Sequence, residues 1–146
     1  MEIYVEKIED EFIEQLKKLK VFQTVDVREP IVNETEITKL LAGTPFCFIH
    51  TLDMTPVPEA RVQDGSATLV DLRFLMLIGS RSLRTKKEGQ RGAYSLLRQV
   101  RETFEGNNFT IEGKNTGTII WEGNQFEFVH GGLIVYSTVF GITRIN

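Results

Sequence analysis

Two apolar stripes with helical spacing constrain the fold of this chain more than any other feature. One stripe lies at the start of the chain and the other in its second half, and the apolar residues in each recur three or four positions apart. That spacing is typical of one face of an α-helix. We therefore predict long amphipathic helices over residues 3–19 and 91–105, each of which needs an apolar surface to cover. The stripes consist of Val5, Ile8, Phe12, Leu16 and Leu19, and of Ala93, Leu97, Val100 and Phe104.

Other parts of the chain have the composition of β-strands. The later half of residues 68–79, the longest predicted strand, is apolar on both faces and should lie centrally in a sheet. Turn residues at 122–124 and 131–132 divide the last part of the chain into an antiparallel meander, in which Phe126, Phe128 and His130 are expected to face inward. The predicted strands cover residues 21–28, 46–52, 68–79, 118–121, 125–130 and 133–142.

A third, shorter helix is predicted over residues 34–42, and loops are predicted over 53–65 and 80–90. The fold class is then α+β, with two long amphipathic helices and one short helix packed in two layers on a mostly antiparallel sheet. A chain of 146 residues with 41% hydrophobic and 25% charged residues fits a single domain over 1–146.

The chain contains no pattern that points to secretion or to a membrane. Its first residues lack the basic and apolar regions of a signal peptide, and no apolar run reaches the ~20 residues that a membrane helix needs. Its one cysteine, Cys47, lies between two phenylalanines and is expected to be a buried, unreactive thiol. We predict synthesis in a reducing cytoplasm.

No residue pattern predicts catalysis, a metal site or a cofactor. Cys47 and His50 would lie on opposite faces of one strand, and His130 is far away in the sequence. Residues 113–116 resemble the end of a phosphate-binding loop, but the required earlier glycine is Asn108 and a strand follows. We predict a protein that is not an enzyme, with no cofactor and no metal. A small enzyme with a site at Cys47 or a histidine stays a minor alternative.

The charges are unevenly distributed. Residues 1–36 carry ten acidic and five basic side chains, whereas residues 81–101 carry seven basic and one acidic. This asymmetry suggests an interaction surface, with a mobile basic loop that meets the acidic region of a neighbouring copy, although two solvated faces would give the same pattern. A helix opening at 89–92 offers a weaker anion site. The candidate interaction residues are Arg81, Arg84, Lys86, Lys87 and Arg91.

Several segments resemble those of the Mu-like prophage tail-protein family, of which the phage Mu tail terminator is a member. They are the N-terminal amphipathic helix, the short helix ending in LLAGTPFCFIH and the strand TLVDLRFLMLIGSRS. The basic loop, the helix RGAYSLLRQVRETFEGNNF and the β-rich end follow in the same order, and residues 79–106 are the most family-like part.

The resemblance implies a structural tail protein, a tail terminator that completes the tail by capping the tube as a homohexameric ring and joining it to the head. The implied partners are copies of itself, the tail-tube and head-completion proteins, and DNA in transient contact within the lumen, with no membrane. The implied location is the virion tail, after assembly in the host bacterial cytoplasm. The alternative is a small nucleic-acid-binding module that acts through the basic residues 81–91.

Overall fold

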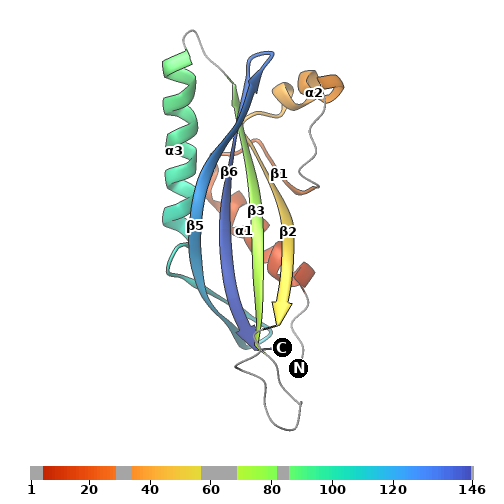
Figure 1. The fold of residues 1–146 in the computed structure, drawn as a ribbon, viewed down its shortest axis with the longest axis vertical. Helices are drawn as coiled ribbons and strands as arrows, with labels where there is room; N and C mark the ends of the chain where they lie inside the picture. The colour runs from red at the N-terminus through yellow and green to blue at the C-terminus, as the bar shows by residue number, and fades with distance from the viewer. Residues whose placement is uncertain (1–4, 29–33, 57–68, 82–85, 146) are drawn as a thin grey trace.

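The structure is a computed structural model that describes residues 5–28, 34–56, 69–81 and 86–145 (Figure 1). Side chains are described in these ranges except at 34, 69, 86–90 and 144–145. The α+β class is confirmed, although the strands near the end of the chain differ from those predicted. The elements are α1 (Val5–Leu19), β1 (Thr24–Val27), the 3-10 helix η1 (Glu34–Glu36), α2 (Ile37–Ala42), β2 (Phe46–Pro56), β3 (Leu69–Arg81), α3 (Lys86–Phe104), β4 (Asn108–Ile111), β5 (Lys114–His130) and β6 (Leu133–Ile145).

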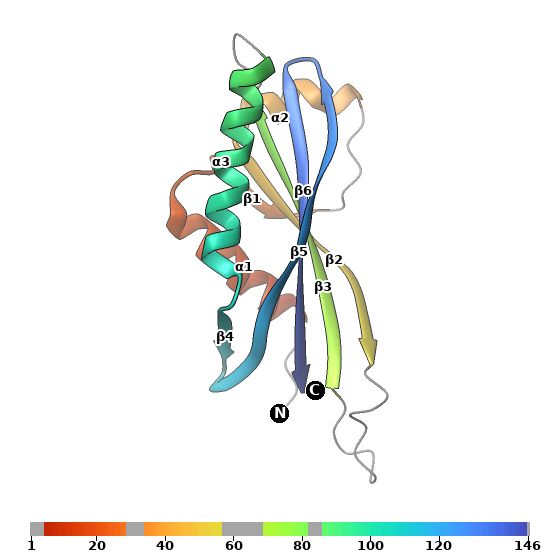
Figure 2. The ribbon, with the colours of Figure 1, turned by 60° about the vertical axis from the view of Figure 1, so that its left-hand side comes forward.

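The strands form one curled, six-stranded mixed sheet in the order β1-β2-β3-β6-β5-β4. Strand β1 is parallel to β2, and the other neighbouring pairs are antiparallel, as the prediction of a mostly antiparallel sheet requires. Strand β3 lies inside the sheet between β2 and β6, as expected. Helices α1 and α3 cover one face of the sheet, while α2 lies on the opposite face near one end (Figures 1 and 2). The three helices therefore do not form a single layer.

The main core lies between the sheet and the two long helices. On α1, Ile8, Phe12 and Leu16 are fully buried, and the predicted stripe of α3 is buried along its whole length. Phe12 is surrounded by the rings of Phe74 and Phe104, whose centroids lie 5.0 and 4.9 Å from its own, and by a third ring, from β4. Both helical predictions are confirmed in their packing, because these stripes are the surfaces that the helices bury.

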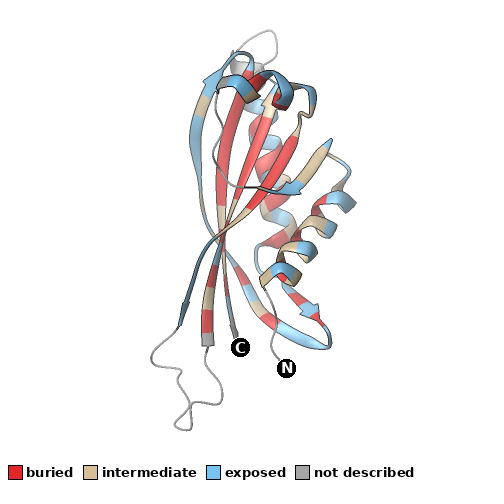
Figure 3. Cartoon of the chain, turned by 90° about the vertical axis from the view of Figure 1, so that its right-hand side faces the viewer, coloured by how far each residue is buried: buried red, intermediate tan, exposed pale blue. Residues whose placement is uncertain are grey.

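A smaller core lies under α2 on the opposite face of the sheet (Figure 3). Here Ile37 and Leu40 pack on the sheet beside Phe46 and Phe48, whose rings are stacked with centroids 4.5 Å apart. The position of Gly79 fits this packing, since a Cβ atom there would lie 2.0 Å from Cζ of Phe46. Phe46 thus lies over backbone where β3 has no side chain, which lets the ring reach full burial.

The predicted loops and turns differ from the structure in three places. Strand β3 extends to Arg81 and helix α3 begins at Lys86, so much of the predicted basic loop is strand or helix. Residues 53–56 belong to β2, while the rest of the predicted loop 53–65 lies outside the described residues. The predicted turn at 122–124 is an irregularity inside β5, which at 17 residues is longer than β3. The actual turn precedes β5, at Glu112 and Gly113, after the unpredicted strand β4.

The prediction that side chains of residues 125–130 point alternately inward and outward is also wrong. Phe126 is paired with Tyr136 and Phe128 with Val135, so Glu127 is an extra residue in β5. An inserted residue breaks the period of two and changes the face on which the following side chains lie. Phe126 is therefore on the α3 side and 49% exposed, while Phe128 contacts the core under α2. His130, which was expected to face inward, is exposed.

Candidate interaction surface

A row of aromatic rings connects α3 to the outer part of β5. The ring of Tyr94 on α3 contacts that of Tyr136 on β6, and Tyr136 contacts Phe126 on β5, with centroid separations of 5.7 and 5.5 Å. Tyr136 is buried beneath the other two, which are 47% and 49% exposed. Burial, and secondarily the hydroxyl of Tyr94, raises the pKa of Tyr136 to about 12. The neutral phenol therefore serves as an apolar base for two exposed rings.

Cationic side chains border these rings along α3. Tyr94, Arg98 and Arg101 line a shallow hollow of about 260 Å³ together with Asn124 of β5. The Arg101 guanidinium lies 3.6 Å from the centroid of the Trp121 ring and donates to Glu105, which raises the pKa of Arg101 and lowers that of Glu105. Arg98 is exposed and has no ion pair with the part of the chain that the structure describes. We define Tyr94, Arg98, Phe126 and Val129 as the β5 surface.

The β5 surface lies beside a strand edge. Strand β4 pairs with β5 only as far as Thr118, and β6 pairs with the other side of β5 from Ile119 to His130. The backbone of Ile119 bonds to Gly106 and Asn107, so within the described ranges the outer edge of β5 has no partner only beyond Ile119. Exposed edges can pair with another chain, and tyrosine, phenylalanine and arginine are enriched at protein interfaces.

The structure does not gather the five predicted interaction residues into one described patch. Arg81 is exposed at the end of β3 and donates to the backbone carbonyl of Leu41, 3.4 Å away, while Arg91 is exposed on α3. Lys86 and Lys87 are in the first turn of α3 with side chains that are not described, and Arg84 lies outside the described residues. Residues 89–92 are inside α3, so they do not open a helix as the anion-site hypothesis required.

The sequence analysis missed the aromatic part of the β5 surface. Tyr94 was not singled out, because it lies between the apolar stripe of α3 and its solvent-facing side. Phe126 was assigned to the interior, because the irregularity at Glu127 has no local signal such as glycine or proline. Only the excess of arginine between 81 and 101 indicated this side of the molecule.

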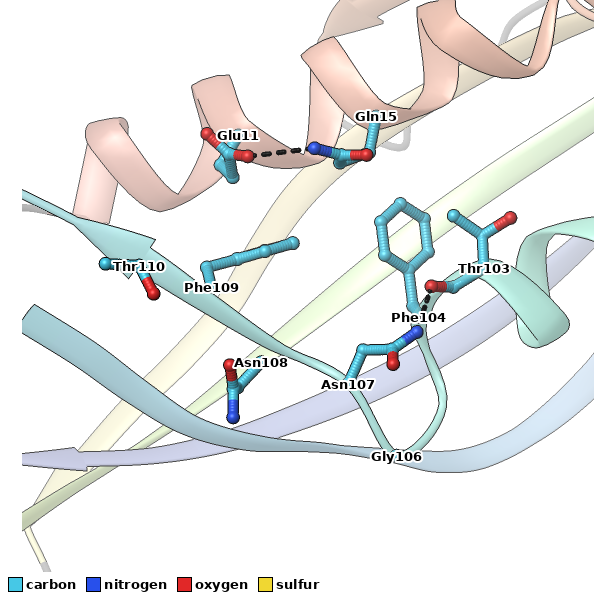
Figure 4. A pocket seen from close by; sticks show the side chains of 9 residues that line it. All are labelled: Glu11, Gln15, Thr103, Phe104, Gly106, Asn107, Asn108, Phe109 and Thr110. Atoms are coloured by element: carbon cyan, nitrogen blue, oxygen red, sulfur yellow. Dashed lines mark hydrogen bonds between the residues drawn. The ribbon is translucent and has the colours of Figure 1, made fainter.

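A separate hollow of about 360 Å³ lies between α1, the end of α3 and β4 (Figure 4). Two hydrogen bonds join polar groups of its lining: Gln15 donates to Glu11 at 3.0 Å, and the Asn107 amide donates to the carbonyl of Thr103 at 2.6 Å. Among the described residues that line it, Glu11 is the one carboxylate. This arrangement supplies hydrogen bonds but no pair of groups for general acid–base catalysis.

The sheet face beside α2 carries a polar network that extends toward the other end of the molecule. Arg73 bridges two carboxylates there, with Nε 3.2 Å from Glu122 and Nη1 3.4 Å from Asp53. The Thr143 hydroxyl donates to Asp71 at 2.5 Å. Exposed pairs of this kind contribute about 0–1 kcal/mol each, so the network keeps this face solvated more than it stabilises the fold.

The chemistry considered for the cysteine and the histidines receives little support from their placement. Cys47 is completely buried on the α1 side of β2, and burial raises the pKa of its thiol well above the usual range. This confirms the expected buried thiol. In the described ranges, no three histidine, cysteine or acidic residues are placed to hold a metal ion together. No helix in the described parts of the chain is long and apolar enough to cross a membrane.

Comparison with solved structures identifies the fold. The chain is similar to a chain in the virion of a native gene transfer agent particle, with a TM-score of 0.65 and 13% sequence identity, and the match covers 95% of each chain. No protein-family model matches the chain, and the search of curated proteins returned no match. At this level of identity the likeness establishes a shared fold across nearly the full length of both chains.

Proposed function

We propose that the protein is a structural component of a phage-like particle. The observation that carries this proposal is the fold shared with a virion chain of a gene transfer agent, because the match covers 95% of each chain. A match restricted to one helix pair or hairpin would carry no such weight, since small motifs recur in many unrelated proteins. In this role the chain works through shape and contact and performs no covalent chemistry.

Within such a particle we propose a tail terminator, as the sequence resemblance implies. Copies of the chain form a homo-oligomeric ring, a hexamer on assembly, that caps the tail tube and joins it to the head. The partners are then the tail-tube and head-completion proteins, the ring lumen faces DNA, and the location is the virion tail, reached from the host bacterial cytoplasm. Exposed apolar and cationic groups on the β5 surface support a role in contacts between proteins.

The test uses the tail-tube protein of the particle to which this chain is proposed to belong. Tubes polymerised with and without the purified chain are compared by electron microscopy for length and for density at their ends. Light scattering measures the mass of the chain alone and on tubes. We expect shorter tubes with a cap at one end. A chain that remains monomeric and never decorates tube ends would contradict the terminator role.

A further inference from the structure

A second exposed surface lies at the opposite side of the sheet from the β5 surface. Strands β2 and β5 are separated by β3 and β6 in the sheet, so their outer edges lie on opposite sides of it; helix α1 contacts β1, β2 and also β4, whereas α3 contacts β3, β6 and β5. Thr51 of β2 donates to Glu9 of α1 at 2.7 Å, so this part of β2 lies beside the first half of α1; Leu52, which follows, is an extra residue in the pairing of β2 with β3. There Leu52 and Met54 are 40% and 54% exposed.

This second surface is acidic where the β5 surface is basic. Glu6 and Asp10 are one turn apart on the exposed side of α1, away from its buried stripe. We define Glu6, Asp10, Leu52 and Met54 as the α1 surface. As defined, the α1 surface carries two acidic side chains and the β5 surface carries Arg98, so the charges of the two sets are opposite, although Glu102, one turn from Arg98 on α3, is exposed too. Such complementarity fixes the orientation of partners and raises their rate of encounter.

The charges of the two surfaces are not neutralised within the subunit. In the described ranges, Glu6, Asp10, Arg91 and Arg98 take part in no ion pair. The bridges nearby are local, such as Glu14 with Lys18 on α1 and Arg101 with Glu105 on α3. The excess acid of α1 and the excess base of α3 are therefore available to a second molecule.

Both surfaces also border a strand edge. Strand β1 pairs with β2 only from Phe46 to Ile49, so in the described part of the chain the outer edge of β2 from His50 onward has no partner, like that of β5 beyond Ile119. Helices α1 and α3 are on the same face of the sheet. Through β6 and β3, Phe126 is level with Cys47, and Ile119 is level with Met54. A second copy shifted along the strands, so that residues 126–129 of one copy reach Leu52 and Met54 of the next, would bring α3 of one copy beside α1 of the other.

We infer that the chain self-associates head to tail, with the β5 surface of one copy binding the α1 surface of the next. The contact is heterologous, because two different surfaces meet, and repetition of a heterologous contact generates a ring when the rotation closes. This inference deepens the proposed function and rests on it, since it specifies the contact from which a ring would be built. Tyr94 and Phe126 supply the apolar centre, and Arg98 faces Asp10.

The test is a charge exchange in the full-length chain. Arg98→Glu and Asp10→Lys are made separately and together, and association is measured by sedimentation velocity over a range of concentrations. Each single variant is expected to associate at least ~tenfold more weakly than the wild type. The double variant should recover, because its altered surfaces complement each other. An equimolar mixture of the single variants should recover for the same reason.

Lys39→Glu is the matched control, because it makes the same change of charge on the exposed side of α2 and should leave association unchanged. Hydrogen exchange gives a second readout: backbone amides of residues 126–129 should become protected when copies associate. Single variants that associate like the wild type would overturn the interface, as would a double variant no better than the weaker single variant. A wild-type chain that shows no association at any concentration would overturn it too.

The tube experiment separates this inference from the proposed function. If the wild-type chain caps tubes while the charge reversals change nothing, the interface is wrong and the terminator role stands. If charge exchange rescues association but no version of the chain binds tube ends, the interface stands and the terminator role fails.

Discussion

Phe12 provides the most direct test of how α1 is attached to the sheet. The side chain is fully buried, and three phenylalanine rings lie with centroids 4.9–5.0 Å from its own. Phe12→Ala removes the ring and leaves a cavity, which costs about 3–5 kcal/mol in a well-packed core. Each lost ring pair adds about 0.5–1.5 kcal/mol beyond burial, so we expect a loss in the upper part of that range. Domains are stable by only about 5–15 kcal/mol, which makes this a large fraction.

The matched control is Phe126→Ala, the same chemical change at a ring that is 49% exposed. We expect it to cost about 1 kcal/mol or less, mainly through its contact with Tyr136. Urea unfolding followed by circular dichroism gives both values, and an unchanged slope with denaturant shows that the difference is one of stability. Phe12→Leu is the milder variant if Phe12→Ala does not fold.

Two results would refute the reasoning about Phe12. The first is a loss below about 2 kcal/mol for Phe12→Ala, which is less than cavity formation in a closed core requires. The second is an equal loss for the two alanine variants. Either would mean that α1 is not held on the sheet by this cluster of rings.

Three further predictions concern other sites. Gly79→Ala should cost about 1–3 kcal/mol in urea unfolding, because its Cβ would lie 2.0 Å from the ring of Phe46, and the cost should fall in a Phe46→Leu background. The Cys47 thiol should not react with a thiol reagent in the folded protein and should react after unfolding. Rapid labelling of the native chain would contradict its burial. Burial raises the pKa of Tyr136 from 10.0 to about 12, so the folded state holds the phenol proton more tightly than the unfolded chain does. This difference stabilises the fold fully below pH 10.0, and the stabilisation is lost as the pH rises from 10.0 to about 12. When the pH is raised over this range, the unfolding midpoint of Tyr136→Phe should fall less than that of the wild type. The same pH dependence in both proteins would contradict a stabilising role of the Tyr136 proton.

The sequence predicted those parts of the fold that depend on local periodicity. The stripes of α1 and α3 repeat without interruption, and both helices bury them. The loop predicted for residues 80–90 is wrong because a polar composition was taken to indicate a loop. Lysine, glutamate, glutamine and arginine are good helix formers, and these residues extend α3 back to Lys86. The irregularities of β5 at Glu122 and Glu127 arise from its pairing with β6: the glycine beside the first was interpreted as a turn, and the second has no signal in the pattern of a single strand.

The residues that hold the fold together are distinct from those proposed to hold copies together. Phe12 is packed inside the subunit and reaches no surface, whereas Phe126 and Arg98 add little to the fold and are exposed. The inserted Glu127 produces this division in β5, because it turns Phe126 outward beside Tyr94 while Phe128 stays on the core under α2. Because of this one extra residue, the two phenylalanines of β5 lie on different faces of the sheet: one belongs to an exposed surface and the other to a core. For this reason Phe126→Ala is informative in two assays: it should leave unfolding nearly unchanged and still weaken association between copies.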